Sequence, residues 1–203
     1  MDYRTIPASE IVTKTIEALK ANGINAQAVK NGEEAKQKVL EMIPEGSQVM
    51  TMTSVTLDTL GISQVLNESG KYESVKKILG TLDSKTQARE KRALGAVPDY
   101  AVGSVHGVTE DGHLIIASNT GSQLPAYAYG AGKVIWVVGT HKIVKDFDTA
   151  MNRLYTHTLP LESERAKKAY GMPGSNVSKM LVINKEVAPD RLHLIFVPEA
   201  LGF

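Results

Sequence analysis

The sequence predicts an α/β fold in which a mostly parallel sheet is flanked by helices and accompanied by a β-hairpin. Helical and strand patterns alternate over the range Ser9–Thr51, which favours parallel strands. The run Val134–Val138 is apolar throughout, as expected for a strand that is buried on both faces. Asp111-Gly112 separates the apolar runs Tyr100–Val105 and His113–Ala117, which predicts a hairpin because glycine accepts a positive φ.

The first predicted helix begins after Ser9, which is its expected N-cap. Apolar residues recur at helical spacing from Val12 to Leu19, and Gly23 is the expected end of this helix. The residues that follow, Ile24–Val29, alternate in polarity and predict an edge strand or a second strand of the sheet.

A capping box and a proline delimit the next helix. Asn31-Gly32-Glu33-Glu34 has the capping-box pattern, and Pro44 ends the helix that follows it. A strand is predicted over Gln48–Thr51. Further along the chain, Lys71–Leu79 fits either a helix or a short strand, and Ser84 is the expected cap of the helix after it.

The last third of the chain is predicted to contain two helices, a loop and two strands. Asp146 is the expected cap of a helix that ends before Pro160, and the charged segment Glu162–Lys168 is predicted to be helical. Two glycines and a proline make Tyr170–Ser178 a predicted loop. The two late strands are Met180–Ile183 and Leu192–Val197.

Composition excludes several classes of function. The 203 residues carry a formal net charge of +1, which argues against a nucleic-acid binder. The absence of cysteine excludes disulfides, thiolate metal sites and a cysteine nucleophile. No apolar run has the length of a membrane span and no signal-peptide pattern is present, so we expect a cytoplasmic protein that does not bind membranes. We expect one domain over residues 1–203.

Common catalytic motifs are missing from the sequence. It contains no G-x-S-x-G, Walker A or H-E-x-x-H pattern, and Gly130-Ala131-Gly132 precedes a strand and lacks the third glycine of a dinucleotide fingerprint. His106 and His113 flank the predicted hairpin turn, where they either face each other across it, take part in cross-strand packing or form a solvent-facing pair. Ser122 is considered as a nucleophile, but no spacing in the sequence demonstrates a catalytic triad. No metal site is expected.

Three polar segments follow predicted strands, where ligands commonly bind in α/β folds. The hydroxyls of Thr53, Ser54 and Thr56 lie at a strand-to-helix junction and either cap the helix or contribute to an anion site. The N–H groups of Gly121 and Ser122 either point at a carboxylate or phosphate, or belong to a plain turn. The candidate ligand-binding residues are Thr53, Ser54, Thr56, Asn119, Thr120, Gly121, Ser122, Gln123, His141 and Lys142.

Four segments carry a resemblance to a known family: Thr53–Ile62, Thr109–Gly112, Val137–Val144 and Leu201–Phe203. Together they resemble the LUD domain family, which takes its name from lactate utilisation and includes the lactate-utilisation protein C. The resemblance extends from the first helix to Phe203. It implies a Rossmann-like fold of the NagB, RpiA and CoA-transferase type, similar to formyltetrahydrofolate cyclo-ligase, with ligands held by loops that follow strands.

Three departures from the family pattern affect the candidate site. Many relatives read Gly-Asn-Arg where this chain has Gly121-Ser122-Gln123, so an arginine suited to a carboxylate or phosphate is missing. Relatives often carry asparagine at the position of His141. Many also carry a cysteine cluster in the interval Tyr170–Leu192, which contains none here, so a metal role of that cluster does not transfer. Lys142 and Arg153 match the family pattern, the first expected to attract an anion and the second to support the loop.

Three functions follow from these observations. The first is binding of a small organic acid or phosphate, as an accessory in the utilisation of lactate or related acids. The second is an enzyme of the sugar-phosphate isomerase or CoA-transferase type, which needs a base or a nucleophilic carboxylate. Asp58 and Asp146 lie near the candidate loops, but both suit helix starts. The third is a subunit that docks onto an oxidoreductase. Homo-oligomers are compatible with each function, and no particular cofactor is implied.

Overall fold

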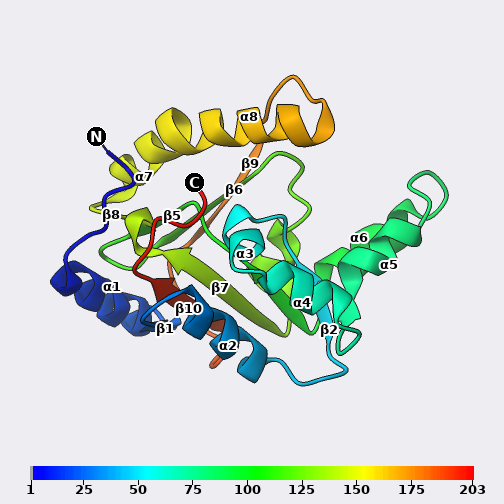
Figure 1. Ribbon diagram of the computed structural model, residues 1–203, viewed down its shortest axis with the longest axis horizontal. Helices are drawn as coiled ribbons and strands as arrows, with labels where there is room; N and C mark the ends of the chain where they lie inside the picture. The colour runs from blue at the N-terminus through cyan, green and yellow to red at the C-terminus, as the bar shows by residue number, and fades with distance from the viewer. Residues whose placement is uncertain (1) are drawn as a thin grey trace.

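The computed structural model describes residues 2–203 and contains two β-sheets (Figure 1). The larger sheet has six strands, and every neighbouring pair in it is parallel. The predicted α/β class with a mostly parallel sheet is therefore confirmed. In spatial order the strands are β1 (Asn25–Ala28), β10 (Leu192–Val197), β7 (Lys133–Gly139), β4 (Tyr100–Gly103), β2 (Gln48–Thr51) and β3 (Glu73–Ser74).

The sequence of β7 is apolar without alternation because the strand is buried on both faces of the sheet. Val134, Trp136 and Val138 pack into one hydrophobic cluster, whereas Ile135 and Val137 pack into a second cluster on the other face of the sheet. All five side chains are fully buried. A strand that is covered on both faces gains burial from every residue, so a continuous apolar run is its expected pattern.

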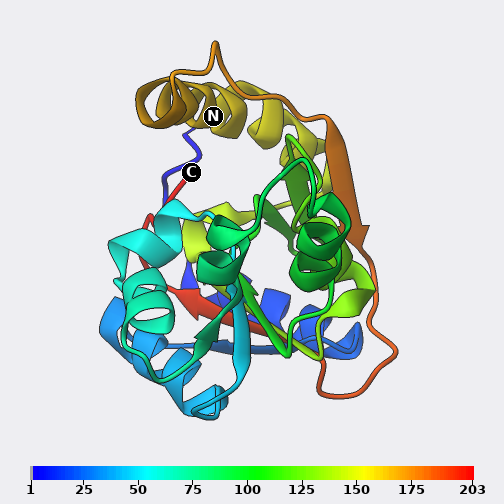
Figure 2. The same cartoon turned by 90° about the vertical axis from the view of Figure 1, so that its right-hand side faces the viewer.

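Helices cover both faces of the larger sheet (Figures 1 and 2). Helices α2, α3 and α4 contribute to the cluster on one face, and α1 packs into the cluster that also contains side chains of the second sheet. Lys71–Leu79 contains both β3 and the start of α5. The helices are α1 (Ser9–Ala21), α2 (Gly32–Met42), α3 (Val55–Thr59), α4 (Ile62–Glu68), α5 (Val75–Thr81), α6 (Ala88–Ala96), α7 (Phe147–Arg153) and α8 (Leu159–Tyr170).

The hairpin prediction is right for the turn and wrong for the first strand. Gly107–Thr109 forms β5, which pairs antiparallel with β6 (Leu114–Ser118) across the turn that contains Gly112. The run Tyr100–Val105 instead supplies β4, which lies between two parallel neighbours of the larger sheet. An apolar run fits either sheet, so its composition does not reveal its partner strand. The second sheet has the order β8 (Ile143–Val144), β5, β6 and β9 (Lys179–Ile183).

The helix that begins at α7 does not end before Pro160, contrary to the prediction. Asp146 caps α7 as expected, because its carboxylate accepts a hydrogen bond from the N–H of Thr149 at 2.9 Å. A turn with π-helical hydrogen bonding, Leu154–Thr158, then joins α7 directly to α8. Pro160 is the second residue of α8 and follows directly on the π-helical turn, whose altered hydrogen-bond pattern accommodates the missing N–H. This continuity carries α8 across the top of the molecule in Figure 1.

The other predicted helix starts have mixed outcomes. The predicted N-cap at Asn31 is confirmed, because Asn31 Oδ1 accepts a hydrogen bond from the N–H of Glu34 at 2.9 Å. The Glu34 carboxylate accepts from the N–H of Lys30 at 2.8 Å rather than from that of Asn31, so the reciprocal bond of a capping box is displaced by one residue. Ser9 is the first residue of α1 rather than its cap, and no side chain caps that helix. Ser84 lies in a turn before α6, which begins at Ala88. Within residues 2–203, none of the helices has the length and apolar character needed to span a membrane.

Asn31→Ala is expected to lower the free energy of unfolding by about 1 kcal/mol, because it removes the side-chain acceptor at the start of α2. Urea denaturation at neutral pH measures the change. Gln37→Ala is the matched control, since Gln37 lies on the exposed side of the same helix and caps nothing. Equal losses of stability in the two variants would contradict the capping role.

Candidate functional site

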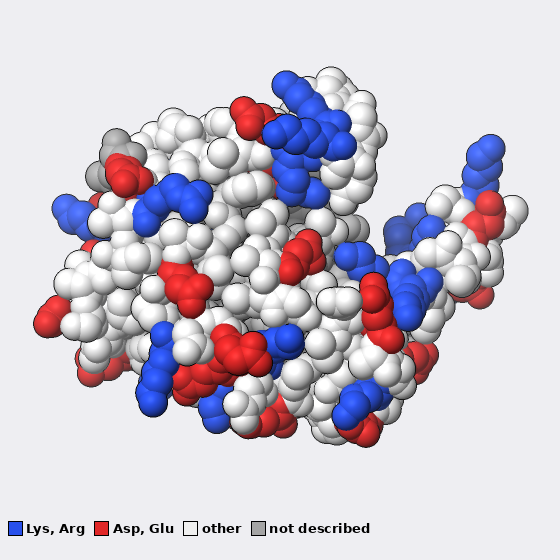
Figure 3. Space-filling view, in the orientation of Figure 1, with Lys and Arg blue, Asp and Glu red and all other residues white. Residues whose placement is uncertain are grey.

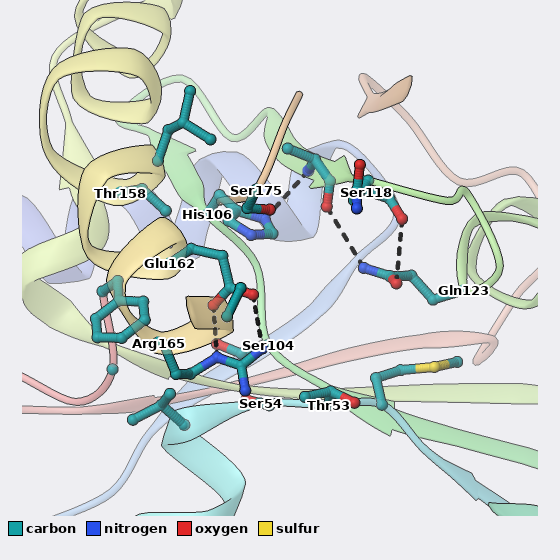
Figure 4. Close-up of a pocket in the computed structure, with 18 of the residues that line it drawn as sticks. Thr53, Ser54, Ser104, His106, Ser118, Gln123, Thr158, Glu162, Arg165 and Ser175 are labelled. Atoms are coloured by element: carbon teal, nitrogen blue, oxygen red, sulfur yellow. Dashed lines mark hydrogen bonds and ion pairs between the residues drawn. The ribbon is translucent and has the colours of Figure 1, made fainter. Parts of the chain in front are cut away.

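A cavity of about 360 Å³ lies where the larger sheet, the second sheet and α8 meet (Figure 4). Its walls come from the segments after β2, β4, β6 and β7, together with α8, the loop after α8 and the last residues of the chain. Strand ends of a parallel sheet meet at one edge, which explains why segments distant in sequence converge there. Figure 3 shows the surface hollowed beneath the end of α8.

Most of the candidate residues line this cavity. They are Thr53, Ser54, Thr56, Asn119, Thr120, Ser122, Gln123 and Lys142. Gly121 and His141 do not line it. Gly121 faces the side chain of Lys179, and a Cβ at Gly121 would lie 2.5 Å from its Cδ. His141 is buried in the core, where its ring packs against Gly139.

The junction between β2 and α3 uses two of its three hydroxyls to hold the fold together. Ser54 Oγ accepts a hydrogen bond from the N–H of Leu57 at 3.4 Å, which makes Ser54 the N-cap of α3. Thr56 Oγ1 donates to the carbonyl of Leu201 at 3.2 Å and ties the end of the chain to α3. The capping alternative is therefore correct for Ser54, and the exposed Thr53 keeps its hydroxyl for the cavity.

The loop after β6 is held by its own hydrogen bonds. Ser118 Oγ accepts from the N–H of Gly121 at 2.8 Å, and the N–H of Ser122 donates to Thr120 Oγ1 at 3.3 Å. Gln123 Nε2 donates to a backbone carbonyl of β6 at 3.4 Å (Figure 4). The N–H groups of Gly121 and Ser122 thus have partners inside the loop, so they belong to a plain turn rather than pointing at a ligand. The cavity is lined by Asn119, Thr120, Ser122 and Gln123 of this loop.

A serine–histidine pair is not formed by the candidate residues. The hydroxyl of Ser122 accepts a hydrogen bond from Thr120 Oγ1 at 3.1 Å. His106 Nδ1 instead accepts from a backbone N–H of β6 at 3.1 Å, and burial lowers the pKa of His106 to about 3. His113 Nε2 lies 3.5 Å from a carboxylate oxygen of Asp111. The two histidines near the hairpin therefore make separate contacts.

Lys142 is a buried amine on the cavity wall. Its Nζ donates to Ser104 Oγ at 3.2 Å and to the carbonyl of Val105 at 3.1 Å, and only 4% of the residue is exposed. Among residues 2–203, no carboxylate lies within ion-pair distance of this amine. Burial lowers the pKa of Lys142 to about 7, and the positive charge of Arg153 adds to the effect.

Arg153 lies behind the cavity wall rather than on it. Its Nη1 donates to the carbonyl of His106 at 2.7 Å and to Thr158 Oγ1 at 2.9 Å. Its Nε and Nη2 have no hydrogen-bond partner in the described part of the chain. Burial lowers the pKa of Arg153 to about 10, so the guanidinium stays charged at neutral pH. Arg153 thus holds the wall from its helix and places a second buried positive charge near Lys142.

The sequence did not predict that α8 forms one wall of the cavity. Arg165 Nε and Nη2 each donate to a carboxylate oxygen of Glu162 at 2.7 Å (Figure 4). This pairing raises the pKa of Arg165, whose guanidinium also lies 5.3 Å from the centre of the Tyr170 ring. The i,i+3 spacing of the pair was visible in the sequence, but it is equally typical of a solvated helix face. Other unpredicted lining residues are Ser104, His106, Thr158, Ser175 and Gly202.

Two further expectations concern carboxylates and metals. Asp58 and Asp146 do not line the cavity, so neither is placed to act as a base there. Glu162 and His106 do line it, and they supply a carboxylate and a neutral imidazole, of which only His106 was considered from the sequence. The described residues contain no group of three or more histidine, aspartate or glutamate side chains arranged to hold a metal ion.

Comparison with known proteins identifies the family. The chain is similar to a DUF162 family protein from Deinococcus radiodurans, with 15% identity, a TM-score of 0.57, and coverage of 94% of this chain and 99% of that one. It is also similar to eIF2B beta from Chaetomium thermophilum, with 10% identity, a TM-score of 0.39, and coverage of 58% of this chain and 44% of that one. A third similar structure is ribose 5-phosphate isomerase from Plasmodium falciparum, with 12% identity, a TM-score of 0.33, and coverage of 64% of this chain and 66% of that one. No curated protein matches the chain. The LUD domain model matches residues 12–197, and the chain therefore belongs to the LUD domain family.

Proposed function

We propose that this chain binds a small organic anion, a carboxylate or a phosphate, in the cavity beneath α8. The observation that carries the proposal is the Lys142 amine, which is buried at the cavity wall and contacts only neutral oxygens. A buried positive charge without an anionic partner is costly, and a bound anion would offset that cost. Arg153, which is fully buried nearby, adds to the positive potential at this wall.

The remaining lining residues suit an anion with several oxygen atoms. Hydroxyls of Thr53, Ser104 and Ser122 provide hydrogen-bond donors on the walls of the cavity. The cavity volume of about 360 Å³ lies at the lower end of the range for ligand sites, which is roughly 300–1,000 Å³. This volume has room for a small metabolite. Membership of a family named for lactate utilisation supports an organic acid as the ligand.

A second candidate function is an enzyme of the isomerase or CoA-transferase type. The observation that favours it is the carboxylate of Glu162 on the wall formed by α8. Its two oxygens are held by Arg165, so a reaction that uses this base requires the arginine to release it. Turnover that is lost in Glu162→Gln, while ligand binding is kept, would support this alternative. Docking onto an oxidoreductase subunit stays a prediction, which co-purification from native cells tests.

Thermal-shift measurements with lactate, pyruvate, sugar phosphates, coenzyme A and folates test the anion-binding proposal. We expect at least one of these anions to raise the melting temperature of the wild type by about 3 °C or more at saturation. The shift is expected to disappear in Lys142→Met, which has no cationic group at the wall. Lys145→Met is the matched control, because Lys145 is exposed and does not line the cavity. Absence of any shift in the wild type would contradict the proposal.

A further inference from the structure

Lys142 Nζ makes two hydrogen bonds to the described part of the chain, which leaves one position of the amine for the cavity. A neutral primary amine has two N–H donors and one lone pair, whereas an ammonium group has three donors. The structure gives Lys142 Nζ two acceptors, Ser104 Oγ at 3.2 Å and the carbonyl of Val105 at 3.1 Å. In the neutral form both N–H bonds are used and the lone pair occupies the remaining position at the wall of the cavity. In the protonated form the same position carries the third N–H, which can donate to a bound anion.

The surroundings of Lys142 favour this neutral form near physiological pH. Burial and the charge of Arg153 lower the pKa of Lys142 to about 7, so about half of the amine is unprotonated at that pH. His106 and His141 also lie nearby, but burial lowers both of their pKa values to about 3 and they are uncharged. No carboxylate in the described part of the chain pairs with the amine to hold its proton.

We propose that Lys142 is a nucleophile that forms an imine with a small 2-oxo acid bound in the cavity. This inference rests on the proposed function, because the carboxylate of the acid is the anion that the cavity must first hold. The 2-oxo acid is chosen over an aldehyde because it supplies both the anion and a reactive carbonyl within one small molecule. An unprotonated, desolvated lysine at a ligand cavity is the group that such chemistry requires.

The reaction proceeds in two balanced steps. The lone pair of Nζ attacks the keto carbon, the carbonyl electron pair moves to oxygen, and one amine proton is transferred to that oxygen to give a carbinolamine. Protonation of the new hydroxyl group by a solvent proton then lets the C–O bond break, with loss of water and formation of a protonated C=N bond. Ser104, whose hydroxyl contacts Nζ, is placed to relay these protons. No oxidant, reductant or metal is consumed.

Reductive trapping of the wild-type protein tests the inference. The protein is incubated with pyruvate at pH 7.5, reduced with borohydride, digested and analysed by mass spectrometry. We expect a stable secondary amine on Lys142, with a mass gain equal to pyruvic acid less one oxygen atom. An exposed lysine with an ordinary pKa is unprotonated in about one molecule in a thousand at this pH, so labelling of Lys142 is expected to exceed that of surface lysines by roughly a hundredfold.

Two variants and one ligand control make the result decisive. Lys142→Arg is expected to lose the adduct, since a guanidinium is not nucleophilic, and Lys145→Met is expected to keep it. Labelling that is spread evenly over surface lysines, or absent from Lys142, overturns the inference.

Lactate has no keto group and cannot form an imine, so it separates the anion-binding proposal from the imine proposal. If lactate stabilises the protein while pyruvate leaves Lys142 unlabelled, only the imine is wrong. If Lys142 is labelled while no anion stabilises the protein, anion binding is wrong and the nucleophile stands.

Discussion

Replacing Lys142 with methionine is expected to raise the free energy of unfolding at pH 7 by about 1–3 kcal/mol, although it removes the group on which anion binding depends. Methionine fills a similar volume and needs no solvation. The loss of donors to Ser104 Oγ and to the carbonyl of Val105 is expected to cost about 1 kcal/mol each, which keeps the net gain below the full cost of burying the amine.

The pH dependence of this gain follows from the pKa of Lys142. The pKa falls from its ordinary value of 10.5 to about 7 in the folded protein, so the unfolded chain binds more protons between these two values. The stability of the wild type therefore rises with pH across this window, and the cost of the buried amine is complete only below about pH 7. His106 and His141, whose pKa values are about 3, stay neutral throughout, and Arg153 is common to both proteins.

Urea denaturation of wild type and Lys142→Met at pH 7 and at pH 9 measures the effect. We expect the difference in stability between the two proteins to be smaller at pH 9 than at pH 7. Lys145→Met serves as the control, because Lys145 is exposed and its removal is expected to change stability by less than about 0.5 kcal/mol. A variant at Lys142 that is less stable than the wild type at pH 7 would contradict this account of the site.

Gly112→Ala is expected to lower the free energy of unfolding by about 2–4 kcal/mol. Gly112 has a φ of 87° in the turn between β5 and β6, a conformation that alanine adopts only with strain. A Cβ at this position would also lie 2.7 Å from the carbonyl carbon of Ala18 and 2.8 Å from the nitrogen of Leu19. These are backbone atoms of α1, which cannot move without separating that helix from the sheet.

Gly80→Ala provides the matched control for this turn. Gly80 lies in α5, and a Cβ there meets no atom within 4 Å. Alanine is expected to stabilise that helix by about 0.5–1 kcal/mol, because it is the better helix former. Chemical denaturation of the two variants is therefore expected to give changes of opposite sign. A Gly112→Ala protein as stable as the wild type would show that α1 and the hairpin turn do not fit together as described.

The elements that the sequence predicted well are those whose signal is local. The N-cap at Asn31 and the apolar run of β7 each follow from a few neighbouring residues, and the structure contains both. The predictions that failed depend on partners elsewhere in the chain. Tyr100–Val105 joins the larger sheet rather than the hairpin, and a π-helical turn lets the helix continue through Pro160. Neither the partner strand nor the continuation of the helix can be predicted from neighbouring residues alone.

The candidate site was predictable in part for the same reason. Polar loops after strands indicated one edge of the sheet, which is where the cavity lies. The pattern did not show that the amides of Gly121 and Ser122 are used within their loop. It also did not show that α8 brings Glu162 and Arg165 to the opposite wall, because that depends on how helices pack rather than on spacing.

A pH titration by heteronuclear NMR tests whether the Lys142 amine is partly neutral and responds to bound anions. Lysine labelled at the ε position gives one signal that is absent from Lys142→Met. We expect this signal to titrate near pH 7 in the free protein, and saturating lactate or phosphate to raise the pKa of the amine by about one unit. A pKa near 10.5 in the free protein, or a pKa that neither anion changes, would contradict this expectation.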